Sequence, residues 1–169
     1  AAGALAAAAP RAWSAWRYTD ADRHQRLLRQ FALGEWETVR VLARELRPQL
    51  QQRLELLFDL DVRLAGIHAR DHGLDEALER LEPWRPRLGK RPGAFDAGVA
   101  SVHLMASDTA GHVAALERAL AADAGSPWRR VEATLAQARF GDAGRADQLL
   151  GPLTDARLPR HADAPLQWA

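Results

Sequence analysis

The chain of 169 residues contains no cysteine, which excludes disulfides, thiolate metal sites and cysteine nucleophiles. The compartment stays open, because a chain this short can lack cysteine by chance. Aromatic residues make up only 7% of the chain, and β-branched residues are sparse beside alanine, leucine, arginine and glutamate. This composition, together with the lack of any convincing period-two alternation, predicts an all-α fold.

Strong charge and long apolar runs are also lacking. The formal net charge is +1, too small to imply a polyanionic partner, so we expect no nucleic acid. Lys90 is the single lysine among 23 basic residues. Arginine forks for carboxylate or phosphate would explain that bias, but a GC-rich coding sequence explains it more simply. No apolar run approaches the roughly 20 residues of a membrane-spanning helix.

Motifs of catalysis and of nucleotide binding are missing as well. The sequence contains no GxSxG elbow, no P-loop and no GxGxxG. His68 and His72 have the i, i+4 spacing at which imidazoles share zinc, but no third ligand accompanies them. Glu55 and Asp59 lie on one helical face, where Arg63 makes an ion-pair ladder the simpler interpretation of the pair. We therefore expect no enzyme, no cofactor and no metal.

Residues 1–19 form an alanine-rich lead-in without a basic region, too weakly hydrophobic for a signal peptide. We interpret it as a linker. The alternative is the outer end of a membrane tether N-terminal to Ala1, because Trp13, Trp16 and Tyr18 follow as an interfacial belt would.

The sequence does contain a series of amphipathic stretches that end at glycine or proline. Gly34, Pro48 and Pro83 are expected to end helices, and Ser126 followed by Pro127 is a good helix start. A loop is expected over 85–93. The expected helices cover 20–33, 35–47, 49–71, 74–82, 94–106, 109–122, 127–140 and 142–153.

Turn residues are followed by apolar or small residues at fixed offsets of five, nine and twelve. These offsets place three residues on one face of a helix. The turns at Gly34, His72 and Gly141 imply a hidden turn near Ser107, with a period close to 34 residues. The residues at the three offsets are Val39, Ala43, Leu46; Ala77, Leu81, Trp84; His112, Leu116, Ala119; and Ala146, Leu150, Leu153.

Two segments, "ARFGDAGRADQLLGPL" (138–153) and "ALGEWETVRVLARELRP" (32–48), resemble tetratricopeptide repeats. The resemblance implies an array of about four antiparallel helical hairpins, a right-handed α-solenoid, over residues 20–158. Residues 159–169 would begin a further helix or a truncated repeat. Val39 and His112 depart from the family's small alanine, and the first helices lack its Trp-x2-Leu-Gly pattern. An irregular helical bundle remains the alternative.

The resemblance also implies which residues line a partner-binding groove. Trp128, Val131 and Leu135 form an apolar stripe that ends at Arg139, suited to a hydrophobic segment with a carboxylate. The alternative is that this stripe belongs to the core. The other groove positions are Ser101, Met105, Asp59, Val62, Arg70 and His24.

A basic loop is a second candidate surface. Trp84, Arg85, Arg87, Lys90 and Arg91 could dock an acidic peptide, an anionic lipid or a nucleic acid. A solvated loop between repeats explains the same residues.

The function expected from these patterns is that of a non-enzymatic scaffold for protein–protein interaction. It would be a helical module of a larger, bacterial-type protein that binds a peptide, another domain or a second copy of itself. Two alternatives are kept: a regulatory domain of a membrane-anchored protein or transcription regulator, and a helical-repeat binder of nucleic acid. The step from fold to function is an analogy.

Overall fold

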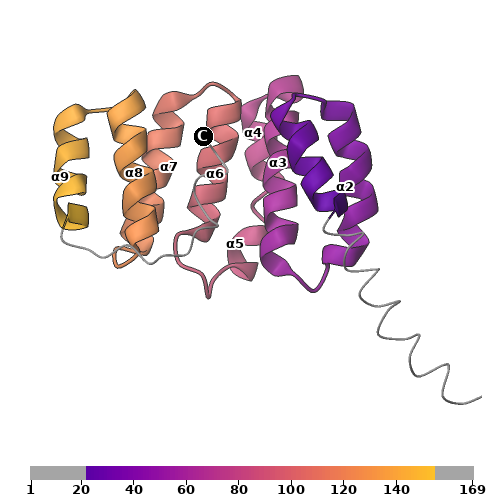
Figure 1. The fold of residues 1–169 in the computed structure, drawn as a ribbon, viewed down its shortest axis with the longest axis horizontal. Coiled ribbons are helices and arrows are strands. Elements are labelled where there is room, and N and C mark those ends of the chain that lie inside the picture. Colours follow the sequence, from indigo (N-terminus) through magenta and orange to yellow (C-terminus); the bar gives the residue numbers. More distant parts are fainter. Residues whose placement is uncertain (1–21, 155–169) are drawn as a thin grey trace, which may run out of the picture. The chain divides into compact units, whose positions relative to one another are not determined.

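The computed structural model describes residues 22–154, and every regular element in that range is a helix (Figure 1). The all-α prediction is confirmed for these residues, whereas the predictions for 1–19 and 159–169 lie outside them. A helix over 22–32 comes first. It is followed by α2 (Trp36–Leu50), α3 (Leu54–His72), α4 (Leu74–Glu79), α5 (Trp84–Arg87), α6 (Ala94–Met105), α7 (Thr109–Ala122), α8 (Pro127–Phe140) and α9 (Ala143–Thr154). None of these helices is long and apolar enough to span a bilayer.

Proline is where the predicted helix ends are wrong. Pro48 lies inside α2, which continues to Leu50. Leu50 is buried one turn after Leu46 and extends the same apolar face, which offsets the one hydrogen bond that a proline removes. The expected loop over 85–93 begins with the short helix α5, in which Trp84 is buried. In contrast, Ser126 caps α8 as predicted, with its hydroxyl accepting from the Arg129 amide.

The chain divides into two compact units, residues 1–64 and 65–169. In the first unit, one face of α2 and the start of α3 supply a core of large aliphatic side chains. Arg63 is also buried there, with its guanidinium 2.9 Å from the Asp59 carboxylate and 4.8 Å from the centre of the Phe31 ring. The buried apolar residues of the described part of this unit are Leu27, Val39, Leu42, Ala43, Leu46, Leu50, Leu57, Phe58, Leu60 and Val62.

In the second unit, α6 packs on α7, α7 on α8, and α8 on α9 (Figure 1). Small residues let these helices approach closely. Gly93 precedes α6 with a φ of 74°, and a Cβ built there would lie 2.4 Å from the Ala119 carbonyl oxygen. The buried alanines of α7, α8 and α9 are Ala115, Ala119, Ala133, Ala136 and Ala146.

The turns before α7 and α9 are held by similar hydrogen bonds. His103 Nδ1 lies 2.8 Å from an Asp108 carboxylate oxygen, and the other oxygen accepts from the Gly111 amide at 2.9 Å. The pKa of Asp108 is lowered, mainly by the hydrogen bond from the Gly111 amide and to a smaller extent by the one with His103.

In the later turn, Gln137 Oε1 accepts from the Asp142 amide at 2.8 Å, and the Asp142 carboxylate accepts from the Arg145 amide at 2.6 Å. The three bonded positions of the later turn therefore each lie 34 residues after those of the earlier one, at 137, 142 and 145 against 103, 108 and 111.

Candidate functional site

The residues of the predicted stripe lie on the exposed side of α8. At about 100° per residue, Trp128, Leu135 and Arg139 fall within about 40° of one another, and Val131 borders them. Leu135 is 63% exposed, Arg139 is exposed, and Trp128 and Val131 are half-buried. An exposed leucine beside a half-exposed tryptophan is the composition of a contact surface.

The opposite side of α8 faces the interior. Ala133, Thr134, Ala136 and Gln137 are buried there. Gln137 donates to the Glu117 carboxylate on α7 at 3.0 Å, and its carbonyl oxygen accepts from the Asp142 amide before α9. These contacts fix the rotation of α8 about its own axis, so the stripe is surface and not core.

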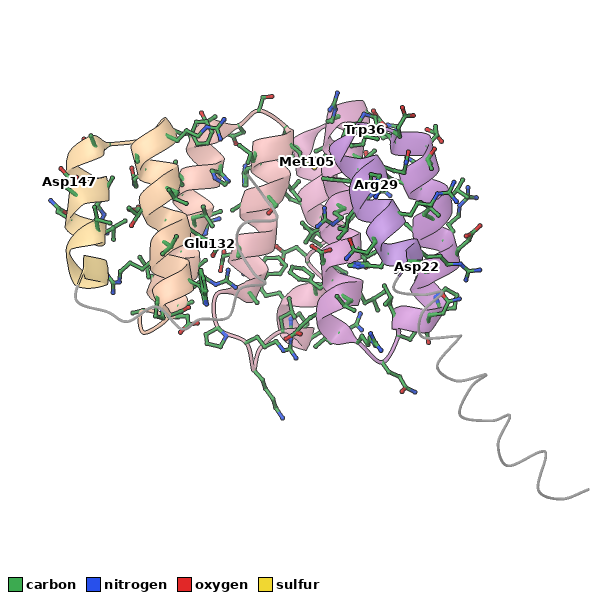
Figure 2. All side chains as sticks on the ribbon, viewed as in Figure 1. Asp22, Arg29, Trp36, Met105, Glu132 and Asp147 are labelled. Carbon is green, nitrogen blue, oxygen red and sulfur yellow. The ribbon has the colours of Figure 1, made fainter. Side chains whose placement is uncertain are left out.

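Glu132 completes this surface and was not among the predicted groove residues, although its i, i+4 spacing from Trp128 places it on the same side of the helix. It lies one turn after Trp128 and is labelled on α8 in Figure 2. Its carboxylate accepts from Arg129 at 2.7 Å. At the other end, the Arg139 guanidinium lies 5.0 Å from the centre of the Phe140 ring. We call Trp128, Val131, Glu132, Leu135 and Arg139 together the α8 surface.

The predicted groove positions on α6 are half-buried. Ser101 donates its hydroxyl to the Ala97 carbonyl at 3.3 Å, within its own helix. The Met105 sulfur packs on α3, since a Cβ built on Gly66 would lie 2.2 Å from it (Figure 2). Met105 therefore contributes mainly to the contact between α3 and α6.

In the first unit the structure brings His24 close to Asp59, where desolvation by burial lowers the pKa of His24 against the opposing effect of Asp59. Val62 is only 5% exposed, which corrects its placement in a groove: its side of α3 belongs to the core. Arg63, expected on the surface, is buried instead, and its guanidinium pairs with the partly exposed carboxylate of Asp59. Arg70, in the second unit, is exposed near the end of α3.

The basic loop also needs correction. Trp84 is 4% exposed, so it anchors α5 and cannot dock a partner. Arg87 stacks on its ring, with the guanidinium carbon 3.9 Å from the ring centre. Arg85 pairs with Glu82 at 2.9 Å, a hydrogen bond that lowers the pKa of Glu82 and raises that of Arg85. Lys90 and Arg91 are exposed.

A concave pocket of about 420 Å³ lies in the second unit. Two ion pairs line it: Glu82 with Arg85, and Asp96 with Arg118 at 3.2 Å. Its charged groups are therefore already paired with one another across the pocket. Leu78, Val99 and His103 complete the lining.

His68 and His72 stack with their ring centres 4.3 Å apart. Within 22–154 no group of three or more potential ligands is positioned to hold a metal ion. His68 Nε2 lies 2.9 Å from a Glu76 carboxylate oxygen. The Arg80 hydrogen bond, and then His68, lower the pKa of Glu76.

Comparison of the chain with protein-family models, curated protein sequences and solved structures finds no match. What can be said of its function therefore comes from its own residues, and the α8 surface is the strongest site they offer.

Proposed function

We propose that the helical part of the chain is a degenerate array of tetratricopeptide-like helical pairs that serves as a non-enzymatic scaffold for protein–protein interaction. The array is a more specific hypothesis than the all-α fold. The binding role is inferred separately, from the α8 surface. The two steps have separate support and separate tests.

The array is supported by positions that correspond at an offset of 34 residues in the second unit. Val99, Ala100 and Val102 of α6 are buried, as are Ala133, Thr134 and Ala136 of α8. The turn hydrogen bonds described above repeat at the same offset. In a stacked array, equivalent residues meet equivalent neighbours, which is why burial and hydrogen bonding would recur with the period of the repeat.

An experimentally determined structure tests the array. Successive helical pairs related by one constant rotation are the expected result. Helices closing around a single shared core would contradict the array and favour an irregular bundle.

The binding role depends on a single observation: α8 turns an apolar and charged face outward while its opposite face is buried. Burying Leu135, which is 63% exposed, against a partner would be favourable, and the adjacent tryptophan and arginine are residue types that dominate binding energies. The α8 surface is therefore the proposed binding site.

Crosslinking and co-purification with Trp128→Ala and Arg139→Ala test this assignment. Each variant is expected to lose specific partners that the unchanged protein captures, while Arg44→Ala, at an exposed arginine of α2, keeps them. Retention of every specific partner by both α8 variants would remove the α8 surface from the proposal.

A further inference from the structure

We propose that the α8 surface binds the α8 surface of a second copy of this chain, as an antiparallel pair of helices related by a two-fold axis. The inference rests on the proposed function, because it names the occupant of the surface proposed there. The charges on either side of Leu135 are complementary to themselves under such an axis.

A contact about a two-fold axis needs a patch that complements itself. Glu132 lies three residues before Leu135, and Arg139 lies four residues after it on the same face. An axis through Leu135 would bring the two leucines together. It would also place each Glu132 beside the Arg139 of the other copy, at heights about 1.5 Å apart.

The direction of pairing follows from the same charges. In a parallel pair each Glu132 would face Glu132, and each Arg139 would face Arg139. Both contacts would be repulsive, whereas the antiparallel pair makes two attractive ones. Glu132 already contacts Arg129 within its own helix, so its carboxylate would be shared between two guanidinium groups.

The expected association is weak. One exposed helix face is smaller than the roughly 800 Å² per partner of a standard stable interface. Val131 adds apolar area beside the central leucine contact, whereas Trp128, seven residues before Leu135, would lie past the end of the partner's α8, so the interface stays small. We therefore expect a dimer whose population depends on protein concentration.

The absence of cysteine allows a direct test with a single thiol. A disulfide forms only where the two Cβ atoms approach to about 4 Å, so a residue near the axis links to its own copy. Leu135→Cys in the full chain is expected to form a covalent dimer under mild oxidation. Leu33→Cys, at a residue that is 66% exposed, is the matched control and should stay largely monomeric. Equal, slow crosslinking of both variants would overturn the proposed pairing.

Charge reversal tests the pairing without a covalent bond. In sedimentation equilibrium, Glu132→Arg and Arg139→Glu are each expected to weaken self-association by about fivefold to tenfold. An equimolar mixture of the two variants should associate about as well as the unchanged chain, because every contact between unlike copies is again attractive. Circular dichroism confirms that each variant keeps its helices.

The outcomes separate this inference from the proposed function. A chain that stays monomeric at all concentrations, or a dimer that the α8 variants do not affect, would overturn the self-pairing. The proposed function would still stand if Leu135→Asp abolished the capture of a different protein. Loss of association in each single variant with recovery in the mixture would support the self-pairing.

Discussion

The core of the first unit and the packing of α7, α8 and α9 are made from different side chains. Leucines dominate the first: Leu27, Leu46 and Leu60 are each at most 1% exposed. Alanines supply most of the buried apolar positions of the second: Ala115, Ala119 and Ala133 are fully buried, beside the less completely buried Leu116, Leu120 and Leu149. A leucine core is sensitive to lost volume, whereas closely approached helices are sensitive to added volume.

The difference between leucine and alanine packing also changes how much polar groups contribute to stability. An alanine side chain buries little apolar area, so helices that meet through alanine gain less from the hydrophobic effect. Between α7, α8 and α9, the Glu117 carboxylate accepts from Gln137 and from Arg145, both at 3.0 Å. We therefore expect these hydrogen bonds to contribute a larger share of the free energy of unfolding here than polar contacts do in the leucine core.

The largest effect is expected from Leu46→Ala, because Leu46 is fully buried in the leucine core. The substitution leaves a cavity and should lower the free energy of unfolding by about 2–5 kcal/mol, measured by urea denaturation. Val41→Ala changes an exposed residue on the same helix and serves as the control. A loss no greater than that of the control would mean that Leu46 is not tightly packed.

Ala133→Leu tests the alanine packing in the opposite sense. The added side chain has no room on the buried face of α8 and should cost about 1–3 kcal/mol. Ala138→Leu, at an exposed position of the same helix, should leave the denaturation midpoint almost unchanged. If the two variants were equally stable, α8 would not be held closely between its neighbours.

Gln137→Ala tests the polar contribution. It would leave the Asp142 amide without its acceptor and remove a donor from Glu117, with an expected cost of about 1–2 kcal/mol. Gln25→Ala, at an exposed helical position away from this network, is the control, with an expected change of at most about 0.5 kcal/mol. A neutral result for Gln137→Ala would show that its two hydrogen bonds contribute little to holding these helices together.

The smallest effect concerns pH and the first unit. The pKa of His24 is lowered in the folded state, mainly by burial, from an ordinary value of 6.5. Below pH 6.5 the unfolded chain therefore binds a proton at His24 more readily than the folded chain does. The contribution of neutral His24 to the free energy of unfolding is complete above that pH and is lost as the pH falls. Urea denaturation at pH 7.5 and 5.0 should show a smaller loss of stability for His24→Gln than for the unchanged chain. An equal loss would assign the pH dependence to other groups.

The sequence predicted α6, α7, α8 and α9 to within one residue because their ends are set by local chemistry. Asp108 and Ser126 cap α7 and α8 through hydrogen bonds to amides three residues later. The end of α2 could not be read in the same way. Whether a helix continues past Pro48 depends on the tertiary burial of Leu50, which no local pattern reveals.

The exposed side chains also divide into those that local sequence predicts and those that depend on tertiary packing. Helical spacing alone placed Trp128, Leu135 and Arg139 on one face, and that placement needs only the period of the helix. Which face is outward depends on the neighbouring helices. For that reason Val62 and Trp84 were assigned to surfaces although both are buried.

Met105 is the single methionine of the chain, and its sulfur occupies the space that a side chain at residue 66 would need. One selectively ¹³C-labelled methyl group would thus give one NMR resonance, assigned without further work. Its chemical shift and linewidth would report directly on the contact between α3 and α6. Because Gly66 has no side chain, Met105 fits against it, and the Met105 methyl group serves as a spectroscopic reporter of that contact.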